Sequence, residues 1–290
     1  MTKDELVLAL QKEVEVYNKI IATEKGDWIV KGFIDLYKNI YTISVDTKVV
    51  SKVLEILLAP ALKEFADKNN FILEEPEQQN HYPDFTFISK ETGEKFALDI
   101  KSGFTKDGKK LNNKMTLGSY TGYFRDRNSV KSTKYPYSDY QIHLVLGVIY
   151  TQSEVDLDNQ NVYSIEDLDK IVSVIRDFKF FVQPKYKIAS DSVGSGNTRN
   201  IGSIQNIEKI INGEGIFAIL GEELYNDFWM FYLNKDMSLK AGIPRAYTNM
   251  KSYSLYKQKG IDLLEKNKEI IEQLNEEDYI EIENEEETDE

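Results

Sequence analysis

The stretch DFTFISKETGEKFALDIK, residues Asp84–Lys101, carries the pattern that decides which fold we expect for this chain. Apolar and polar residues alternate in both of its halves, which is typical of strands with one buried face. Between the halves, the ETGE segment offers Thr92 and Gly93 for a tight turn. The stretch therefore predicts a β-hairpin.

A pairing of Glu91 with Glu94 would set the register of this hairpin. It would place three further pairs opposite one another: Asp84 with Lys101, Thr86 with Asp99, and Phe85 with Ile100. Paired side chains share a face, so one face would be apolar, and the other would gather Asp84, Thr86, Asp99 and Lys101. A slip of one residue would mix apolar and polar side chains on each face, so their clean separation supports this register.

Two interpretations of the polar face remain open on spacing alone. It could be a surface cluster of ion pairs, worth about 0–1 kcal/mol each, and this is the better choice for so common a pattern as acid-x-lysine. Alternatively, Asp84 and Asp99 could supply the oxygen ligands that Mg²⁺ prefers. A metal-bound water would then attack a phosphodiester, while Lys101 offsets the charge developing on the phosphate.

The flanking sequence predicts a mixed α/β fold. TKVVSKVLEILLAPALKEFADK, residues 47–68, has apolar residues at helical spacing, with Asp46 or Thr47 as its cap and a kink at Pro60. Strand-like segments occupy 71–74, 84–89, 95–101, 141–151 and 178–182, and helical ones 204–212 and 221–233. We expect one domain over residues 1–265, followed by the end of a helix that starts near Ile261 and an acidic tail over 266–290.

Composition and charge narrow the class of protein. The chain has no cysteine and two histidines, which excludes disulfides, a thiol nucleophile and a histidine-rich metal site. Its net charge is −13, but residues 276–290 hold ten acids and no base, so the remainder carries −3, since −13 plus 10 is −3. Between Lys95 and Lys134, ten Lys or Arg stand against three acids. This basic stretch is either a solvated face or a track for phosphates.

No apolar run is long enough to cross a membrane, and the amphipathic start MTKDELVLALQKE does not resemble a signal peptide. We therefore expect a cytoplasmic protein without a membrane partner.

The segment VGSGNTRNIGS, residues 193–203, is a second candidate site because it is rich in glycine and in hydrogen-bonding side chains. A phosphate-binding loop is disfavoured, since no Lys-Ser or Lys-Thr follows Gly202 and Arg199 stands where a G-x-G-x-x-G pattern needs glycine. A plain surface loop is the remaining alternative on composition alone.

Several blocks of sequence together resemble a known family. Pro83-Asp84 followed by Asp99-Ile100-Lys101 resembles the PD-(D/E)xK signature of metal-dependent nucleases. The longer blocks VDTKVVSKVLEILLAPALKEFADKNNFILEEPEQQNHYPDFT, ALDIK, TLGSYTGYFR and GSGNTRNIGSI are similar, in this order, to EcoRV-like type II restriction endonucleases. They span roughly residues 45–205. The resemblance implies the restriction-endonuclease fold, with a mixed sheet flanked by helices.

The resemblance also implies roles for individual residues. Asp84, Asp99 and Glu55 match the family's metal-binding and catalytic acids, and Lys101 matches its catalytic lysine. Base recognition falls to Gly194, Ser195, Gly196, Asn197, Thr198 and Asn80. Contacts to the DNA backbone, or support of the loops, fall to Gln78, Gln79, Thr47, Lys48, Arg199, Asn200 and Arg125. On composition alone the segment Gln78–Tyr82 would be an ordinary polar turn, and His143 a core histidine.

Three positions depart from the family pattern, which has threonine where Arg199 and Gly103 stand and tyrosine at Phe104. The resemblance otherwise implies a Mg²⁺-dependent homodimer on a palindromic double-stranded site, GATATC, cut bluntly at its centre. A DNA methyltransferase would act on the same site without being a stable partner. Alternatives are a repair or recombination nuclease that recognises DNA structure, and a catalytically silent DNA-binding protein.

Overall fold

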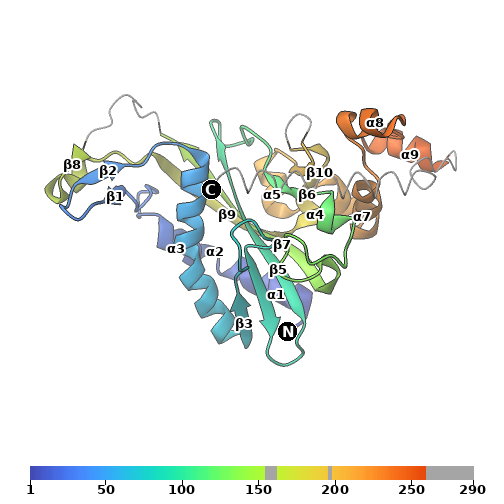
Figure 1. Cartoon of the computed structure of the whole chain (residues 1–290). Helices are drawn as coiled ribbons and strands as arrows, with labels where there is room; N and C mark the ends of the chain where they lie inside the picture. Colours follow the sequence, from blue (N-terminus) through green and yellow to red (C-terminus); the bar gives the residue numbers. More distant parts are fainter. Residues whose placement is uncertain (154–161, 195–197, 259–290) are drawn as a thin grey trace.

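The computed structural model describes residues 1–153, 162–194 and 198–258, and a five-stranded mixed sheet forms its centre (Figure 1). The strands lie in the order β3-β4-β5-β7-β9. Their bounds are β3 Phe71–Glu74, β4 Phe85–Ser89, β5 Lys95–Thr105, β7 Tyr140–Gln152 and β9 Ile175–Pro184. β5 and β7 are parallel, and the other neighbours are antiparallel. All five predicted strands are therefore present, and the mixed sheet flanked by helices is confirmed.

The hairpin of β4 and β5 has the predicted faces but not the predicted register. Its pairs are Phe85 with Leu98, Thr86 with Ala97, Phe87 with Phe96, and Ile88 with Lys95. The expected pairing of Glu91 with Glu94 is wrong, because the turn closes one step earlier, where the Ser89 amide donates to the Glu94 carbonyl at 2.9 Å. Gly93 takes the left-handed conformation, with φ +73°, inside this longer turn. The error is two residues, so every side chain keeps its predicted face.

Each face of the sheet is covered by its own hydrophobic cluster. Helices α1 (Lys3–Lys12), α2 (Val14–Ile21) and α3 (Thr47–Lys68) lie on the side of Phe85, Phe87, Phe96 and Leu98. The opposite cluster contains Ala97 and draws on the C-terminal half of the chain. Its helices are α4 Lys185–Ile188, α5 Ile207–Asn212, α6 Ile216–Leu220, α7 Glu222–Met230, α8 Lys235–Ala241 and α9 Met250–Gln258.

Helix α3 begins where the sequence predicted. The Asp46 carboxylate accepts hydrogen bonds from the amides of Lys48 and Val49, so Asp46 is the cap. Apolar residues at helical spacing turn one side of α3 into the core: Val50, Leu54, Leu58, Leu62 and Phe65 are buried. Pro60 lies within the helix, which continues past it to Lys68.

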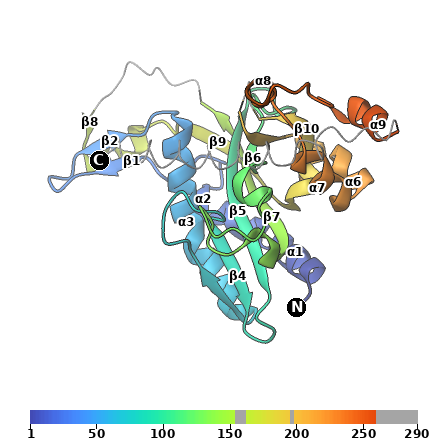
Figure 2. The ribbon, with the colours of Figure 1, turned by 45° about the vertical axis from the view of Figure 1, so that its right-hand side comes forward.

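Two smaller sheets lie beside the central one. The first has the order β1-β2-β8 and the second β10-β11-β6. Their bounds are β1 Gly32–Ile34, β2 Ile40–Thr42, β8 Val162–Tyr163, β10 Ala189–Val193, β11 Asn200–Ser203 and β6 Thr116–Ser119. Short 3₁₀ segments are η1 Gly122–Phe124, η2 Tyr137–Asp139 and η3 Ile165–Lys170. Both views place the β1-β2-β8 sheet and helix α9 at opposite ends of the molecule (Figures 1 and 2).

Gly147 in β7 marks the tightest point of the central sheet. It pairs with Lys101 of β5 on one side and with Phe181 of β9 on the other. A Cβ atom at this position would lie 1.9 Å from the Phe181 ring. No side chain fits here unless that ring moves.

The helix expected near Ile261 and the acidic tail lie outside the described residues, as do residues 154–161 and 195–197. Within the described ranges, no helix combines the length and apolar character needed to cross a membrane.

Candidate active site

The structure brings together the acid and lysine side chains predicted from the hairpin. The Lys101 ammonium lies 3.3 Å from the Asp99 carboxylate and 3.7 Å from that of Asp84. Main-chain groups fix the two acids: the Ile100 amide donates to Asp84 Oδ2 at 2.7 Å, and the Asp84 amide donates to Asp99 Oδ1 at 3.4 Å. Carried one step further, the observed register sets Asp84 opposite Asp99. The two carboxylates are thus closer partners than the predicted register implied.

Asp99 is not a surface residue, so the simple surface ion-pair interpretation is wrong for it. It is 3% exposed, and Thr86 beside it is 1% exposed, because the second hydrophobic cluster covers this face of the sheet. The side chains of Asp84 and Lys101 each remain 25% exposed. Solvent and a ligand can therefore approach the pair from the side of Asp84 and Lys101.

The crowding of charges shifts the pKa values of both Asp84 and Lys101. Burial and the neighbouring Asp99 raise the pKa of Asp84 to about 6, against the opposing effect of Lys101. Burial alone would lower the pKa of Lys101, but the charges of Asp99 and Asp84 outweigh it and raise this pKa. The lysine is hence held as an ammonium, and the charged form of Asp84 is disfavoured by burial and by the neighbouring acid.

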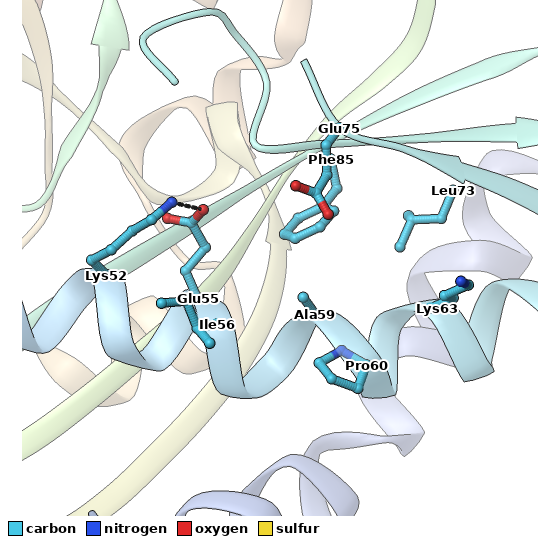
Figure 3. Close-up of a pocket in the computed structure, with 9 residues that line it drawn as sticks. All are labelled: Lys52, Glu55, Ile56, Ala59, Pro60, Lys63, Leu73, Glu75 and Phe85. Atoms are coloured by element: carbon cyan, nitrogen blue, oxygen red, sulfur yellow. Dashed lines mark hydrogen bonds and ion pairs between the residues drawn. The ribbon is translucent and has the colours of Figure 1, made fainter. Parts of the chain in front are cut away.

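Glu55 lies on α3 at the edge of this cluster. Its carboxylate pairs with Lys52 at 2.6 Å, and its charge contributes to raising the pKa of Asp84. Figure 3 shows Glu55 at one end of a pocket of about 550 Å³ between α3 and the strands, with Phe85 and Glu75 across from the helix. The structure thus places Glu55 near Asp84, with Lys52 as its partner.

The donor set has the chemistry that Mg²⁺ requires. This ion is commonly held by one or two carboxylates and several waters, and Asp84 and Asp99 present two converging carboxylates. Within the described ranges, no cluster of three or more His, Cys, Asp or Glu side chains could hold a metal ion. In this structure Glu55 pairs with Lys52 and forms no three-acid cluster with Asp84 and Asp99, so its place among the metal ligands stays a prediction.

Sequence reasoning missed a second lysine beside Asp99. Lys185, at the start of α4, is 3% exposed, and its ammonium lies 3.9 Å from Asp99 Oδ2. Burial lowers the pKa of Lys185 to about 8, although Asp99 acts to raise it. The only signal in the sequence is a lysine directly after the apolar strand FKFFVQP, and nothing there links it to Asp99.

Lys185 also contacts a buried group of aromatic residues. It donates to the Tyr82 hydroxyl at 3.1 Å and lies 4.2 Å from the centre of the Tyr82 ring. The Tyr82 hydroxyl in turn lies 2.7 Å from His143 Nδ1, and the His143 ring stacks on Tyr137 with centroids 3.6 Å apart. His143 is 8% exposed, and burial, aided by Lys185, holds its pKa well below the usual value. His143 is the core histidine that the sequence predicted.

The predicted recognition loop connects β10 to β11, and Ser195, Gly196 and Asn197 lie outside the described residues. At the base of the loop, the Gly194 amide donates to the Asn200 carbonyl at 2.9 Å. Tyr120, buried after β6, holds the returning chain through its hydroxyl to the Thr198 carbonyl at 3.3 Å and its amide to the Arg199 carbonyl at 2.9 Å.

Further support for this loop comes from distant parts of the chain. Lys114 donates to the Ser192 hydroxyl at 2.5 Å and to the Ser190 hydroxyl at 3.3 Å. Asp191 accepts from the Met250 amide at 2.9 Å, which ties β10 to the start of α9. None of these partners was among the predicted site residues.

The remaining predicted DNA contacts fall into two groups. Thr47 and Lys48 in the first turn of α3, and Gln78, Gln79 and Asn80 in the loop before Asp84, are exposed. Arg125 instead is half-buried: its guanidinium donates to the Tyr232 carbonyl and lies 5.6 Å from the centre of the Tyr120 ring. Its position suits support of the loop's surroundings better than direct contact with DNA.

Comparisons with a family model, with curated proteins and with solved structures each give a match. The family model described as "Restriction endonuclease EcoRV" matches residues 24–258. The type II restriction enzyme EcoRV of Escherichia coli is 39% identical over 212 residues, which are 72% of this chain and 84% of that protein. A solved structure of the NlaIV restriction endonuclease aligns with 89% of this chain and 86% of its own, but with a TM-score of 0.37 and 14% identity, too low to support a conclusion.

Proposed function

Since the chain belongs to the family of EcoRV restriction endonucleases and is a type II site-specific deoxyribonuclease, we propose that Asp84, Asp99 and Lys101 form its catalytic site. The observation that carries this proposal is the convergence of the Asp84 and Asp99 carboxylates on the Lys101 ammonium, 3.7 Å and 3.3 Å from its Nζ. The reaction is hydrolysis of phosphodiesters in double-stranded DNA.

Asp84 and Asp99 are the residues that we propose to hold Mg²⁺. The bound ion would supply a Lewis acid and a water of lowered pKa. Lys101, whose pKa is raised by the two carboxylates, stays protonated at neutral pH and offsets charge on the phosphate in the transition state. It is therefore unsuited to act as a general base. Glu55, on the family resemblance, is proposed as a third acid near the metal, which requires it to leave Lys52.

We propose the palindrome GATATC, cut bluntly at its centre, as the recognition site. The support is the likeness of the loop from Gly194 to Asn200 to the family's recognition loop, with Asn80 in the loop opposite. Glycines allow close approach to base edges, and Asn197 and Thr198 offer side-chain donors and acceptors for the major groove. Thr47, Lys48, Gln78, Gln79, Arg199 and Asn200 are proposed to contact the DNA backbone.

A homodimer is the proposed assembly, since a palindrome is matched by two-fold symmetry in the protein. The β1-β2-β8 sheet supports this proposal: Leu36 is 90% exposed and Tyr37 82%, and Phe33, Ile34 and Tyr41 beside them are about half exposed. An apolar patch of this kind marks an interaction surface. Leu36→Lys should lower the molecular mass measured by sedimentation toward that of the monomer. A variant that stays a dimer would show that the interface lies elsewhere.

We propose that the enzyme acts in the cytoplasm and that a DNA methyltransferase protects the same site on the host's DNA without forming a stable complex with it. This pairing is what keeps a site-specific nuclease from cutting its own genome.

Incubation of the protein with a mixed-sequence plasmid and Mg²⁺ tests the function directly. Discrete fragments with blunt GAT and ATC ends are expected. Fragments with other ends would contradict the proposed site alone, random degradation would favour a nuclease that recognises structure, and intact plasmid would favour a silent DNA-binding protein.

A further inference from the structure

Lys185 is a buried ammonium beside Asp99 to which the proposed reaction assigns no task. At 3% exposure it has lost nearly all contact with water, which is costly for a charge unless its surroundings compensate. A residue needed only to fill the core would be better served by an apolar side chain of similar length. The presence of a charge at this depth therefore points to a role that depends on charge.

The contacts of Lys185 connect the two segments that carry the carboxylates. One contact is with Asp99 Oδ2, the same oxygen that Lys101 approaches from 3.3 Å. The other is with the hydroxyl of Tyr82, two residues before Asp84. Asp84 follows Tyr82 through Pro83, so a fixed Tyr82 limits where the Asp84 backbone can lie.

Lys185 also stands at the start of the chain segment that leads to the recognition loop. It opens α4, which is followed directly by β10 and then by the loop at Gly194. Gly118 of β6 lies beside the ammonium: a Cβ at that position would be in ordinary van der Waals contact with Lys185 Nζ, at 3.5 Å. The catalytic acids, the Tyr82 segment and the support of the loop therefore meet at one ammonium group.

We propose that Lys185 is a positioning residue whose ammonium holds the carboxylate of Asp99 and the hydroxyl of Tyr82, so that Asp99 and Asp84 keep one geometry before metal and DNA arrive. The inference rests on the proposed catalytic site. Groups that orient the first ligands of a metal site typically change activity or metal affinity by about 10–100-fold when they are removed.

The absence of cysteine from the chain permits a sharp test of the charge. Lys185→Cys introduces a single thiol. In denaturant, 2-bromoethylamine converts it to an S-aminoethyl side chain of the same length as lysine, and 2-bromoethanol converts it to a neutral analogue of nearly the same shape. Wild-type protein taken through the same refolding is the reference, and Lys187→Cys on the same short helix, treated identically, is the matched control.

We expect single-turnover cleavage in Mg²⁺ to fall about 10–100-fold in Lys185→Cys and in its hydroxyethyl form, and to return to within about threefold of wild type in the aminoethyl form. Equal recovery by both forms would show that Lys185 only fills space, and an undiminished rate in Lys185→Cys would overturn the proposal. Wild-type protein that does not cut DNA would instead contradict the proposed function. The Lys187→Cys forms should all cut at the wild-type rate.

Binding of Mn²⁺ without DNA, followed by electron paramagnetic resonance, examines the same carboxylates without turnover. The aminoethyl form should match wild type, and the hydroxyethyl form should differ by at least about threefold, since a charge 3.9 Å from Asp99 is lost. Identical binding in both forms would contradict a charge-dependent role.

If the Lys185→Cys forms do not refold, Tyr82→Phe gives a second test, because it removes only the hydroxyl that Lys185 contacts. It should slow cleavage about 3–10-fold, the size of one hydrogen bond, and it should also lower the melting temperature, since the same hydroxyl lies 2.7 Å from His143 Nδ1. A wild-type rate in this variant would overturn the proposal.

Discussion

The proposed catalytic hairpin and the proposed recognition loop are held in place in different ways. Asp84 and Asp99 are fixed by amides of their own hairpin and lie within or beside the central sheet. The loop from Gly194 to Asn200 depends on Tyr120, Lys114 and the start of α9, all far away in the sequence. The proposed catalytic groups thus rest on local geometry that one sequence pattern specifies. The proposed recognition loop rests on contacts that only the complete fold brings together.

This difference implies that a substitution in the hairpin should remove chemistry without affecting DNA binding, whereas one around the loop should change which DNA is bound and cut. The expected effects below run from the largest to the smallest.

The largest effect is expected at the hairpin. Asp99→Ala or Lys101→Ala should reduce cleavage by at least about 10²–10³-fold, because Asp99 is proposed to hold the metal and Lys101 to offset charge in the transition state. Single-turnover rates measure the loss, and circular dichroism and sedimentation check that the folded assembly persists. Robust cutting by either variant would show that the catalytic groups lie elsewhere.

Asn197→Ala examines the loop. Removing one good base contact costs about 1–3 kcal/mol, and a symmetric dimer loses it twice, so cognate cleavage should fall by about 30-fold or more. Non-specific DNA binding should stay unchanged. Arg199→Thr is the companion variant, and it should leave the preferred site intact if Arg199 contacts only phosphate. A new preferred site in Arg199→Thr would instead make Arg199 a contact to bases.

The raised pKa of Asp84 makes a prediction for stability. A folded-state pKa of about 6, above the ordinary value of 3.8, destabilises the metal-free protein as pH rises from about 4 to 6, since the unfolded state ionises first. Asp84→Asn should remove this effect and be more stable than wild type at pH 7 by on the order of 1–2 kcal/mol.

Chemical denaturation in the presence of a chelator measures this difference at pH 4 and at pH 7. The two proteins should converge near pH 4, and Mg²⁺ should narrow the gap at pH 7 by stabilising wild type alone. A gap that is constant over this range of pH would show that Asp84 is not the titrating group.

Tyr120→Phe should have a smaller effect, which falls mainly on the loop. It removes the hydroxyl that donates to the Thr198 carbonyl, and one such hydrogen bond contributes about 0.5–1.5 kcal/mol. Cognate binding, measured by fluorescence anisotropy with Ca²⁺ in place of Mg²⁺, should weaken by about 3–10-fold. Equal weakening on non-cognate DNA would mean that Tyr120 supports the fold in general rather than the loop.

The smallest effect is expected from deletion of residues 276–290. Their ten acids would compete with phosphates for the basic stretch between Lys95 and Lys134, so the shortened protein should bind non-specific DNA more tightly at low salt. The gain should fade as salt screens the charges. An unchanged affinity in 50 mM salt would place the tail away from the DNA.

The difference between local and long-range contacts also explains which features could be predicted from the sequence. Alternation with a period of two specified the faces of the hairpin, and the helical spacing of Val50, Leu54 and Leu58 specified α3. The register was missed because Gly93 can close a turn of more than one length. Lys185 and Tyr120 were missed because no short-range pattern shows that a lysine will be buried against Asp99, or that a tyrosine will hold a distant carbonyl.

The crowding at Gly147 has a consequence for genetics. In a host without protective methylation, an active enzyme of this kind would be lethal, so selection for survivors collects inactivating alleles. Substitutions of Gly147 should appear among them beside those of Lys101, its partner in the neighbouring strand, although Gly147 has no side chain to offer a substrate. Second-site suppressors would distinguish the two kinds of allele. A smaller residue at Phe181 makes room for a side chain at 147 and can restore activity to a Gly147 substitution, whereas no change at Phe181 replaces the missing ammonium of a Lys101 substitution.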